Sequence, residues 1–193
     1  MKRIISIILL LSLVVLMFSS CNKDEKEGLY GTHHVEMTFK DYGTIKLELY
    51  GDIAPITVKN FIELTRSGYY DGLTILRVQP GFVIQGGDGP DVPAIKGEFL
   101  ANGVENTLSH KRGVISMART SEYDSASSQF FICLSDDCRY SLDYLYAGFG
   151  IVTEGMDVVD AIVNGVPSEA FLNNMGFLAS DYQIVIEHAK VID

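Results

Sequence analysis

The stretch that decides the fold of this chain is ILRVQPGFVIQGGD, at residues 75–88. Its turn pair, Pro80-Gly81, separates two β-rich runs, and this pattern predicts a strand, a tight turn and a second strand. The first run carries a cation, Arg77, and the second carries an amide, Gln85, eight residues later. The stretch therefore predicts a β-hairpin with one polar side chain of chemical interest on each strand.

The second run also predicts an orientation, because side chains alternate between the two faces of a strand. We expect Phe82 and Ile84 to point to one face of the sheet, and Val83 and Gln85 to point to the other. The glycine pair at 86–87 then lets the backbone leave the sheet sharply, since glycine adopts conformations that other residues avoid.

Other parts of the chain alternate apolar and polar residues in the same way. Residues 35–39 and 45–50 predict a hairpin with one buried face. Further strands are predicted at 113–118, 129–134, 147–152 and 181–192. Many alternating strands with few helices indicate a mainly β fold, a closed antiparallel barrel.

Two stretches predict helices, and one predicts a long loop. Pro55 suits the first turn of a helix, and Gly68 suits its end. Residues 153–163 predict a second helix. Residues 89–112 are irregular, and a loop of this length inside a compact domain is usually functional. The apolar stripe of the first helix consists of Val58, Phe61, Ile62 and Thr65.

The N-terminus has the pattern of a targeting segment. Lys2 and Arg3 precede an apolar run at 4–18, which is short for a bilayer span of about 20 residues. The run ends in Ser19-Ser20-Cys21, and this end resembles a bacterial lipobox. We expect a lipoprotein signal peptide at 1–20, a lipidated Cys21 with a charged tether at 21–32, and one domain at 33–193. The alternatives are an ordinary cleaved signal or a transmembrane anchor.

The charge balance limits the partners. The chain carries a net charge of −10, which becomes about −12 when Lys2 and Arg3 leave with the signal peptide. Such a surface repels nucleic acid and anionic lipid. We therefore expect no nucleic-acid partner, and a membrane attachment that depends on the lipid at Cys21. We further expect a monomer in the bacterial cell envelope, facing the periplasm or the cell surface.

Cysteine and histidine spacing indicates no metal site. Cys133 and Cys138 are not in a C-x-x-C arrangement, and the chain has no second pair. We expect Cys133 to be a small buried apolar residue, although a disulfide with Cys138 stays open in an oxidising envelope. His33 and His34 precede the first strand, and we interpret them as a solvated strand start. The sequence shows no sign of a cofactor.

Three collinear motifs carry a family resemblance. The pattern R-V-x-P-G-F-V-I-Q-G-G-D starts at Arg77, a block at 113–132 contains S-M-A and S-x-Q-F-F-I, and LDYLYAGFG follows at 142–150. The chain resembles the cyclophilins, the peptidyl-prolyl cis/trans isomerases, from about His34 to its C-terminus. The resemblance implies a closed eight-stranded antiparallel barrel, capped by an α-helix at each end, with the active site on its outer face. It also implies that proline-containing polypeptides are the substrates.

The resemblance assigns roles to ten residues. Arg77 takes the place of the catalytic arginine, and Gln85 and Gln129 match amides that position the arginine and the substrate carbonyl. Ala118 and Arg119 match the pair whose backbone holds the residue before proline. Arg119 is often Asn in the family, which favours a shift in the charge preference for substrates. The walls of the proline pocket match Phe82, Val83, Phe131, Leu142 and Tyr146, and Phe82 is counted with Arg77 and Gln85 among the catalytic residues.

One departure concerns a family inhibitor, and one alternative function stays open. The tryptophan that contacts cyclosporin in the family has no counterpart, since Tyr140 or Ser141 falls near its place. A module that binds proline segments without turnover remains an alternative to the isomerase. Retention of Arg77, Gln85 and Phe131 favours the enzyme, because a binder has no need of that arginine. A serine hydrolase is excluded, since the chain has no G-x-S-x-G motif.

Overall fold

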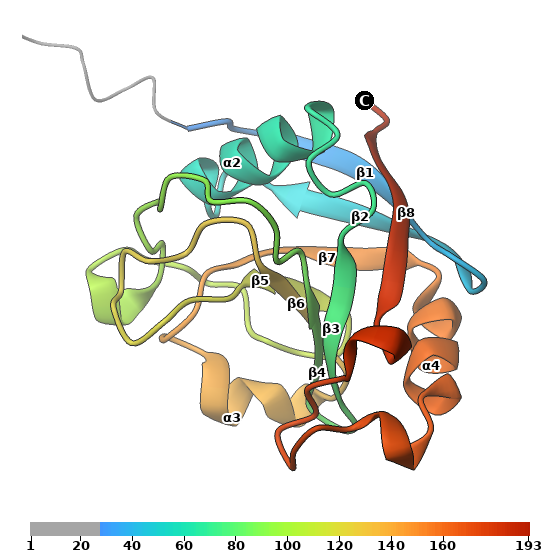
Figure 1. Cartoon of the computed structure of the whole chain (residues 1–193). Helices are drawn as coiled ribbons and strands as arrows, with labels where there is room; N and C mark the ends of the chain where they lie inside the picture. Colours follow the sequence, from blue (N-terminus) through green and yellow to red (C-terminus); the bar gives the residue numbers. More distant parts are fainter. Residues whose placement is uncertain (1–27) are drawn as a thin grey trace, which may run out of the picture.

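The computed structural model describes residues 28–193, which form a closed β-barrel (Figure 1). All strand pairs are antiparallel, and the strand order around the barrel is β1-β2-β7-β5-β6-β4-β3-β8. The predicted eight-stranded barrel is confirmed. The predicted signal peptide, the lipidation site Cys21 and the tether up to residue 27 lie outside the described residues.

The strands follow the alternation of the sequence. In β1 the apolar positions Val35, Met37 and Phe39 are buried in the barrel, and the residues between them are partly exposed. Two strands are shorter by one residue at each end than the sequence predicts, namely β5 and β6. The strands are β1 (Thr32–Phe39), β2 (Gly43–Tyr50), β3 (Thr74–Gln79), β4 (Val83–Gly86), β5 (Val114–Met117), β6 (Phe130–Cys133), β7 (Gly148–Glu154) and β8 (Ile184–Val191).

Two helices cover the ends of the barrel, α2 (Pro55–Arg66) at one end and α4 (Met156–Gly165) at the other (Figure 1). The predicted stripe of α2 is buried. The predicted start of the second helix at residue 153 is wrong. Thr153 and Glu154 extend β7, where Glu154 pairs with Lys46 of β2. Gly155, at φ 88°, then breaks the strand and begins the helix.

The hairpin of β3 and β4 has the predicted strands, but the predicted orientation of one side chain is wrong. Val83 and Gln85 point outward together, and Ile84 enters the barrel core, as predicted. Phe82 does not share the face of Ile84, because it lies in the turn before β4, where its N–H donates to the Gln79 carbonyl at 3.0 Å. Its ring therefore packs on the outer face, beside Val83.

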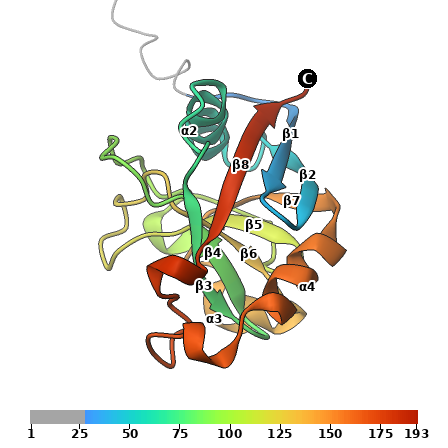
Figure 2. The ribbon, with the colours of Figure 1, turned by 45° about the vertical axis from the view of Figure 1, so that its right-hand side comes forward.

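A segment that we call the strap, residues 166–183, crosses the outside of β3 before β8 begins. It contains the turns η3 (Ser168–Ala170) and η4 (Ser180–Tyr182), so β8 starts three residues later than predicted. The N–H of Val78 donates to Gly176 at 2.8 Å, and the N–H of Leu178 donates to Leu76 at 2.8 Å. The strap therefore hydrogen-bonds along β3, which lies beside β8 in Figure 2.

Three short helical segments lie in the loops that connect the strands. The long loop after β4 contains η1 (Leu100–Asn102), and η2 (Asp136–Cys138) leads into the four-residue helix α3 (Arg139–Leu142), which the sequence did not predict. Both cysteines of this region are free and buried, and the Sγ of Cys138 donates to the Phe82 carbonyl at 3.0 Å. His33 and His34 lie within β1, after Thr32, and do not precede it as predicted; both contact the carboxylate of Asp193.

Membrane-spanning helices and metal clusters are both absent from the described part of the chain. Among residues 28–193, no helix has the length and the apolar character that a membrane crossing requires. Within the same residues, no three His, Cys, Asp or Glu side chains are grouped to hold a metal ion.

Candidate active site

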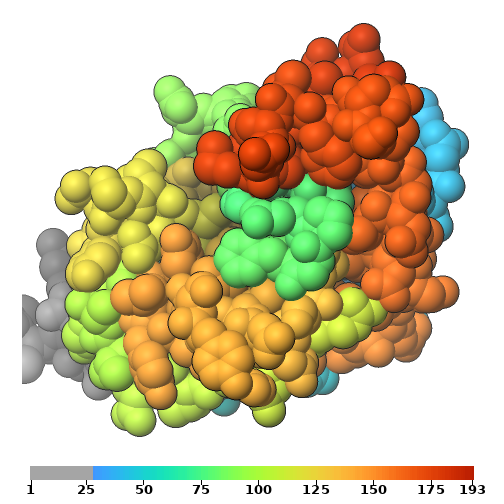
Figure 3. All heavy atoms as spheres, turned by 90° about the horizontal axis from the view of Figure 1, so that it is seen from below, coloured from blue at the N-terminus to red at the C-terminus, as the bar shows by residue number. Residues whose placement is uncertain are grey.

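A hollow of about 430 Å³ lies on the outer face of the barrel. Figure 3 shows this face, where the β3–β4 hairpin, the strap, the loop after β5 and the α3 region border one another. Nine of the ten residues that the sequence assigns to a site line this hollow, and the tenth, Gln129, hydrogen-bonds to Gln85 beside it. The lining residues are Arg77, Phe82, Val83, Gln85, Ala118, Arg119, Phe131, Leu142, Tyr146, Met175 and Phe177.

The floor of the hollow is an apolar cluster separate from the barrel core. Val83, Phe131 and Leu142 are each no more than 5% exposed, although they point away from the barrel interior. Side chains alternate along β6, so Phe130 and Ile132, the neighbours of Phe131, enter the main core instead. The ring of Tyr146 meets Phe131 edge to face at 5.7 Å between centroids. The result is a cup of side chains that suits an apolar ring.

Arg77 stands at the side of this cup and is held by three acceptors. Its Nη1 donates to Oε1 of Gln85 at 3.1 Å, its Nη2 donates to Oε1 of Gln79, and its Nε donates to the Met175 carbonyl at 2.7 Å. Burial lowers the pKa of Arg77 from its ordinary value, but a guanidinium stays charged at any physiological pH. Arginine has five N–H donors, so two remain for a ligand.

A chain of amides fixes the acceptor for Arg77. The Nε2 of Gln85 donates to Oε1 of Gln129 at 2.9 Å, and the Nε2 of Gln129 donates to Oδ1 of Asp88 at 2.9 Å. A carboxylate only accepts, so Asp88 dictates which way each amide faces. This direction places the oxygen of Gln85 toward Arg77. Sequence reasoning found both glutamines and missed Asp88, the last residue of the opening stretch.

The side chain of Arg119 joins three loops around the hollow. Its Nε and Nη2 donate to the Leu145 carbonyl at 3.0 and 2.9 Å, and its guanidinium lies 4.6 Å from the ring centroid of Tyr146. Phe99 and Tyr123 also face the guanidinium, each at 5.1 Å. We expected Arg119 to select substrates by their charge. Its contacts indicate a second role, which is to hold Tyr146 in the wall of the hollow.

The strap supplies two lining residues that the sequence did not predict. The backbone of Phe177 forms an isolated antiparallel β-bridge with Arg77, and the centroid of its ring lies 5.5 Å from the Cζ of the guanidinium. Met175 contributes the carbonyl that accepts from Arg77 and an exposed side chain at the rim. The strap sequence has no strand or helix period, so no pattern connects it to Arg77. Gly176 is the one local sign of a close backbone approach.

A buried polar pair supports the floor from behind. His110 is 1% exposed, and its ring stacks on Phe131 at 6.1 Å. Its Nδ1 lies 2.9 Å from Oδ1 of Asp143, and its Nε2 lies 2.9 Å from Oγ of Ser116. Burial lowers the pKa of His110, although hydrogen bonding to Asp143 opposes the shift. The lowered pKa favours the neutral ring, which packs against Phe131 from behind.

Comparison with known proteins agrees with the fold. The family described as cyclophilin type peptidyl-prolyl cis-trans isomerase/CLD matches residues 34–191. Peptidyl-prolyl cis-trans isomerase A of Dickeya dadantii is 41% identical over 175 residues, which covers 82% of this chain and 84% of that protein. Peptidyl-prolyl cis-trans isomerase B of Escherichia coli is 40% identical over 131 residues, covering 63% and 79%.

The solved structures show the same likeness in three dimensions. A cyclophilin type isomerase of Cryptosporidium parvum superposes with a TM-score of 0.69 and 26% identity, covering 84% of this chain and 99% of that chain. A further crystal structure of that protein, obtained in the presence of the dipeptide Ala-Pro, gives a TM-score of 0.68. The chain belongs to the cyclophilin-type peptidyl-prolyl cis-trans isomerases.

Proposed function

We propose that this isomerase accelerates the rotation of X–Pro bonds in proteins that fold in the bacterial envelope, and that a lipid on Cys21 anchors it to a membrane. The placement rests on the N-terminal sequence, with its basic start, its apolar run and its Ser-Ser-Cys end. We further propose that the domain acts as a monomer, on either the periplasmic side or the cell surface. Its substrates are the proline-containing segments of unfolded chains.

The reaction needs no nucleophile and no metal. Rotation about a peptide bond has a barrier of about 18–20 kcal/mol, because resonance places negative charge on oxygen and positive charge on nitrogen. For X–Pro bonds the end states differ by only about 0.5–1 kcal/mol, yet exchange takes tens to hundreds of seconds. A catalyst must therefore stabilise the twisted amide, in which this resonance is broken.

The hollow offers two means of doing so. An apolar cup formed by Val83, Phe131 and Leu142 surrounds the proline ring and disfavours the charge separation of the planar amide. Arg77 aims its remaining N–H donors at the prolyl nitrogen, which becomes pyramidal and basic when the bond twists. A hydrogen bond to a charged group contributes about 1.5–3 kcal/mol, which corresponds to one to two decades in rate.

The observation that carries the proposal is that Arg77 is already oriented. Three acceptors on three different segments hold its guanidinium beside the cup. A preorganised donor needs no rearrangement when charge develops on the reacting group, and this is the condition under which electrostatic stabilisation is largest. A module that only binds proline segments would need the cup but not a guanidinium held in this way.

The test compares Arg77→Ala with a matched control, Arg66→Ala, which removes an exposed arginine from the end of α2. Exchange at an X–Pro peptide is measured by NMR or by a protease-coupled assay, and circular dichroism verifies the fold. We expect a loss of about tenfold or more for Arg77→Ala and no loss for Arg66→Ala. A folded wild type that binds the peptide without speeding exchange would instead establish the binding module.

The anchor has a separate test. Cells that produce the protein are grown with an alkyne-labelled fatty acid, and the wild type is compared with Cys21→Ser. We expect the label and the membrane association in the wild type and neither in Cys21→Ser. Label-free wild type in the soluble fraction would contradict the anchor and leave the isomerase proposal intact.

A further inference from the structure

Large apolar side chains gather at the surface around the proline hollow. Among residues 28–193, ten large hydrophobic side chains are exposed. Six of them lie on the strap, on the loop after β5 or in the α3 region, which border this hollow, and a seventh lies on the long loop after β4. Exposed apolar patches of this kind usually mark a binding surface. The seven are Leu100, Tyr123, Tyr140, Tyr144, Leu145, Leu172 and Met175.

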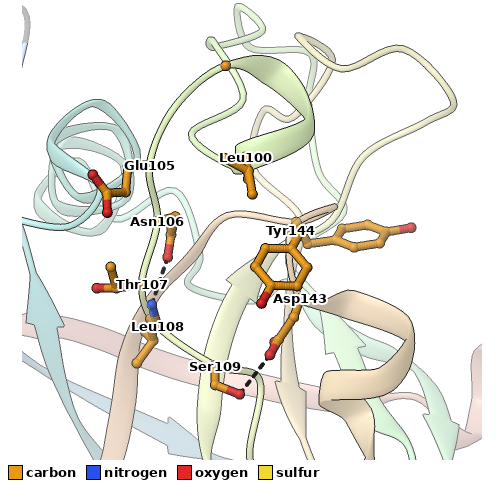
Figure 4. A pocket seen from close by; sticks show the side chains of 10 residues that line it. Leu100, Glu105, Asn106, Thr107, Leu108, Ser109, Asp143 and Tyr144 are labelled. Carbon is orange, nitrogen blue, oxygen red and sulfur yellow. Dashed lines mark hydrogen bonds between the residues drawn. The ribbon is translucent and has the colours of Figure 1, made fainter.

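Some of these side chains surround a second hollow, of about 660 Å³, which shares Tyr146 with the proline hollow. Figure 4 shows the second hollow, with Leu100 and Tyr144 on one side and the chain from Glu105 to Ser109 on the other. Its volume is typical of a pocket for a small ligand. One tyrosine ring therefore separates two adjoining sites on the same face.

The polar groups that line this second hollow are largely engaged within the fold. The Nδ2 of Asn106 donates to the carbonyls of Glu98 and Gly148, both at 2.9 Å, and its Oδ1 accepts from the Leu108 N–H at 3.1 Å. An amide has two donors and one acceptor oxygen, so Asn106 has no donor left for a ligand. Its function is to hold the loop.

Ser109 and His110, beside the second hollow, also make their hydrogen bonds within the fold. The hydroxyl of Ser109 donates to Oδ2 of Asp143 at 2.7 Å, and the N–H of His110 donates to Oδ1 at 2.7 Å. Glu105 and Thr107 are exposed to solvent and are already hydrated. The surfaces that gain from being covered are therefore apolar, namely the side chains of Leu100, Leu108, Tyr144 and Tyr146.

Tyr144 is held in an unusual backbone conformation at the rim. It has φ 69°, one of two non-glycine residues with positive φ in the described part of the chain, and its side chain stays 64% exposed. Its carbonyl accepts from the Ala101 N–H at 2.9 Å, which ties the two sides of the hollow together. Such conformations are uncommon for bulky residues, and they concentrate at functional sites.

We propose that this second hollow binds a large apolar side chain, aliphatic or aromatic, of the same polypeptide whose proline occupies the first hollow. The inference rests on the proposed isomerase function, because it places a substrate proline in the first hollow. Successive side chains of an extended chain lie a few ångströms apart, so a neighbouring residue reaches across Tyr146. The preferred substrates are then unfolded chains with an apolar residue close to the proline.

The experiment uses the purified protein and two sets of peptides with one Ala-Pro core. In the first set a single Phe occupies, one peptide at a time, the third or second position before the proline or one of the three positions after it, and in the second set Ser replaces Phe. We expect kcat/KM to rise about three- to tenfold for Phe over Ser at one position, because burial of a large apolar side chain is worth this much or more. No difference at any position overturns the proposal.

Two variants locate the effect. Tyr144→Gly removes the ring and suits the positive φ, and Leu100→Ser removes an exposed apolar side chain. Each should reduce the preference for Phe to less than half, while the short Ala-Pro peptide is turned over as before. Tyr30→Ser, which removes another exposed tyrosine, is the control and should keep the preference.

The outcomes separate this proposal from the isomerase itself. A Phe preference that survives both variants overturns the second hollow as its cause. Both proposals are supported together if Arg77→Ala loses turnover of the short peptide, while Tyr144→Gly keeps that turnover and loses the preference for Phe. If the wild type does not turn over the short peptide, the isomerase function fails, and binding of labelled Phe and Ser peptides to the wild type and to Tyr144→Gly still decides the second hollow.

Discussion

The Nε of Arg77 donates a hydrogen bond of 2.7 Å to the main-chain carbonyl of Met175, 98 residues further along the chain. The orientation of the Arg77 guanidinium therefore depends on the strap, a segment that lies outside the regular barrel. Backbone hydrogen bonds at Gly176, the neighbour of Met175, and at Leu178 hold the strap to β3. Any change that lifts the strap should reach Arg77.

Gly176→Ala should lower the isomerase rate without touching a residue of the hollow's apolar cup. Gly176 has φ 87°, and a Cβ there would overlap the carbonyl oxygen of Val78. The strap must then move away from β3, and the Met175 carbonyl moves with it. We expect kcat/KM to fall about three- to tenfold, which equals roughly 0.7–1.4 kcal/mol, measured with an X–Pro peptide.

The matched control is Gly72→Ala, because Gly72 also has a positive φ of 83° and a Cβ added there would meet no atom within 4 Å. It carries the same backbone strain of about 1–2 kcal/mol for an L-residue in this region. We expect a lower melting temperature in both variants and a lower rate only in Gly176→Ala. Equal rates in the two variants would show that the strap does not position Arg77.

The amide chain predicts that a residue outside the hollow affects the rate. Asp88→Ala removes the acceptor that orients Gln129, which then no longer holds Gln85 toward Arg77. We expect kcat/KM to fall about two- to fivefold, in keeping with one exposed hydrogen bond of about 0.5–1 kcal/mol. Asp91→Ala, which removes an exposed carboxylate three residues further along the chain, should leave the rate unchanged.

We also expect Gln129→Leu to lower kcat/KM more than Asp88→Ala does. Gln129 hydrogen-bonds directly to Gln85, whereas Asp88 lies at the far end of the hydrogen-bond chain. If both variants turn over the peptide at the wild-type rate, the amides are structural and Arg77 is held by the strap and Gln79 alone.

Much of the fold follows from the alternation of apolar and polar residues along the sequence. The strands β1 and β2 alternate, so their buried residues were predictable, and the three motifs together located nine lining residues. Phe82 was placed on the wrong face, because alternation applies within a strand and Phe82 lies in the turn before it. The second helix begins later than predicted for a similar reason, because strand pairing extends β7 to Glu154.

The parts that the sequence missed are long-range contacts between segments without a period. Met175 reaches Arg77 through one carbonyl, and a carbonyl has no side-chain signature. Asp88 and His110 act behind the hollow, through hydrogen bonds to residues that are distant in sequence. Side-chain patterns indicate which residues turn inward, but not which loop closes over an outward face.

Arg119 offers a prediction that separates two roles. If its side chain holds Tyr146, then Arg119→Lys should lower kcat/KM, because lysine keeps the charge but cannot donate twice to the Leu145 carbonyl while stacking on the ring. We expect a loss of about three- to tenfold, consistent with a stacked cation worth roughly 0.5–2 kcal/mol. The loss should be the same for peptides with Glu, Ala or Lys before the proline.

The other role predicts a different pattern from the same peptides. If the guanidinium reads substrate charge, Arg119→Ala slows the Glu peptide selectively and Arg119→Lys restores it. Arg66→Lys, at the end of α2, is the control for the exchange of arginine and lysine and should have no effect on any of the three peptides.

The burial of His110 makes stability depend on pH. Burial lowers its pKa in the folded state, whereas an unfolded histidine titrates near its ordinary value of about 6.5. As the pH falls through this value, the unfolded chain takes up a proton that the folded chain does not, so the free energy of unfolding falls. The loss continues until the pH reaches the folded-state pKa, with a slope of at most about 1.4 kcal/mol per pH unit for this group. Urea unfolding between pH 7.5 and 5 measures it.

His110→Gln should flatten this dependence, because the titrating ring is gone from both states. The variant loses contacts with Asp143 and Ser116 and should be less stable at every pH, so the slope against pH is the quantity to compare. His188→Gln removes an exposed histidine of β8 and should leave the slope as it is in the wild type. A slope that survives in His110→Gln would assign the pH dependence to other groups.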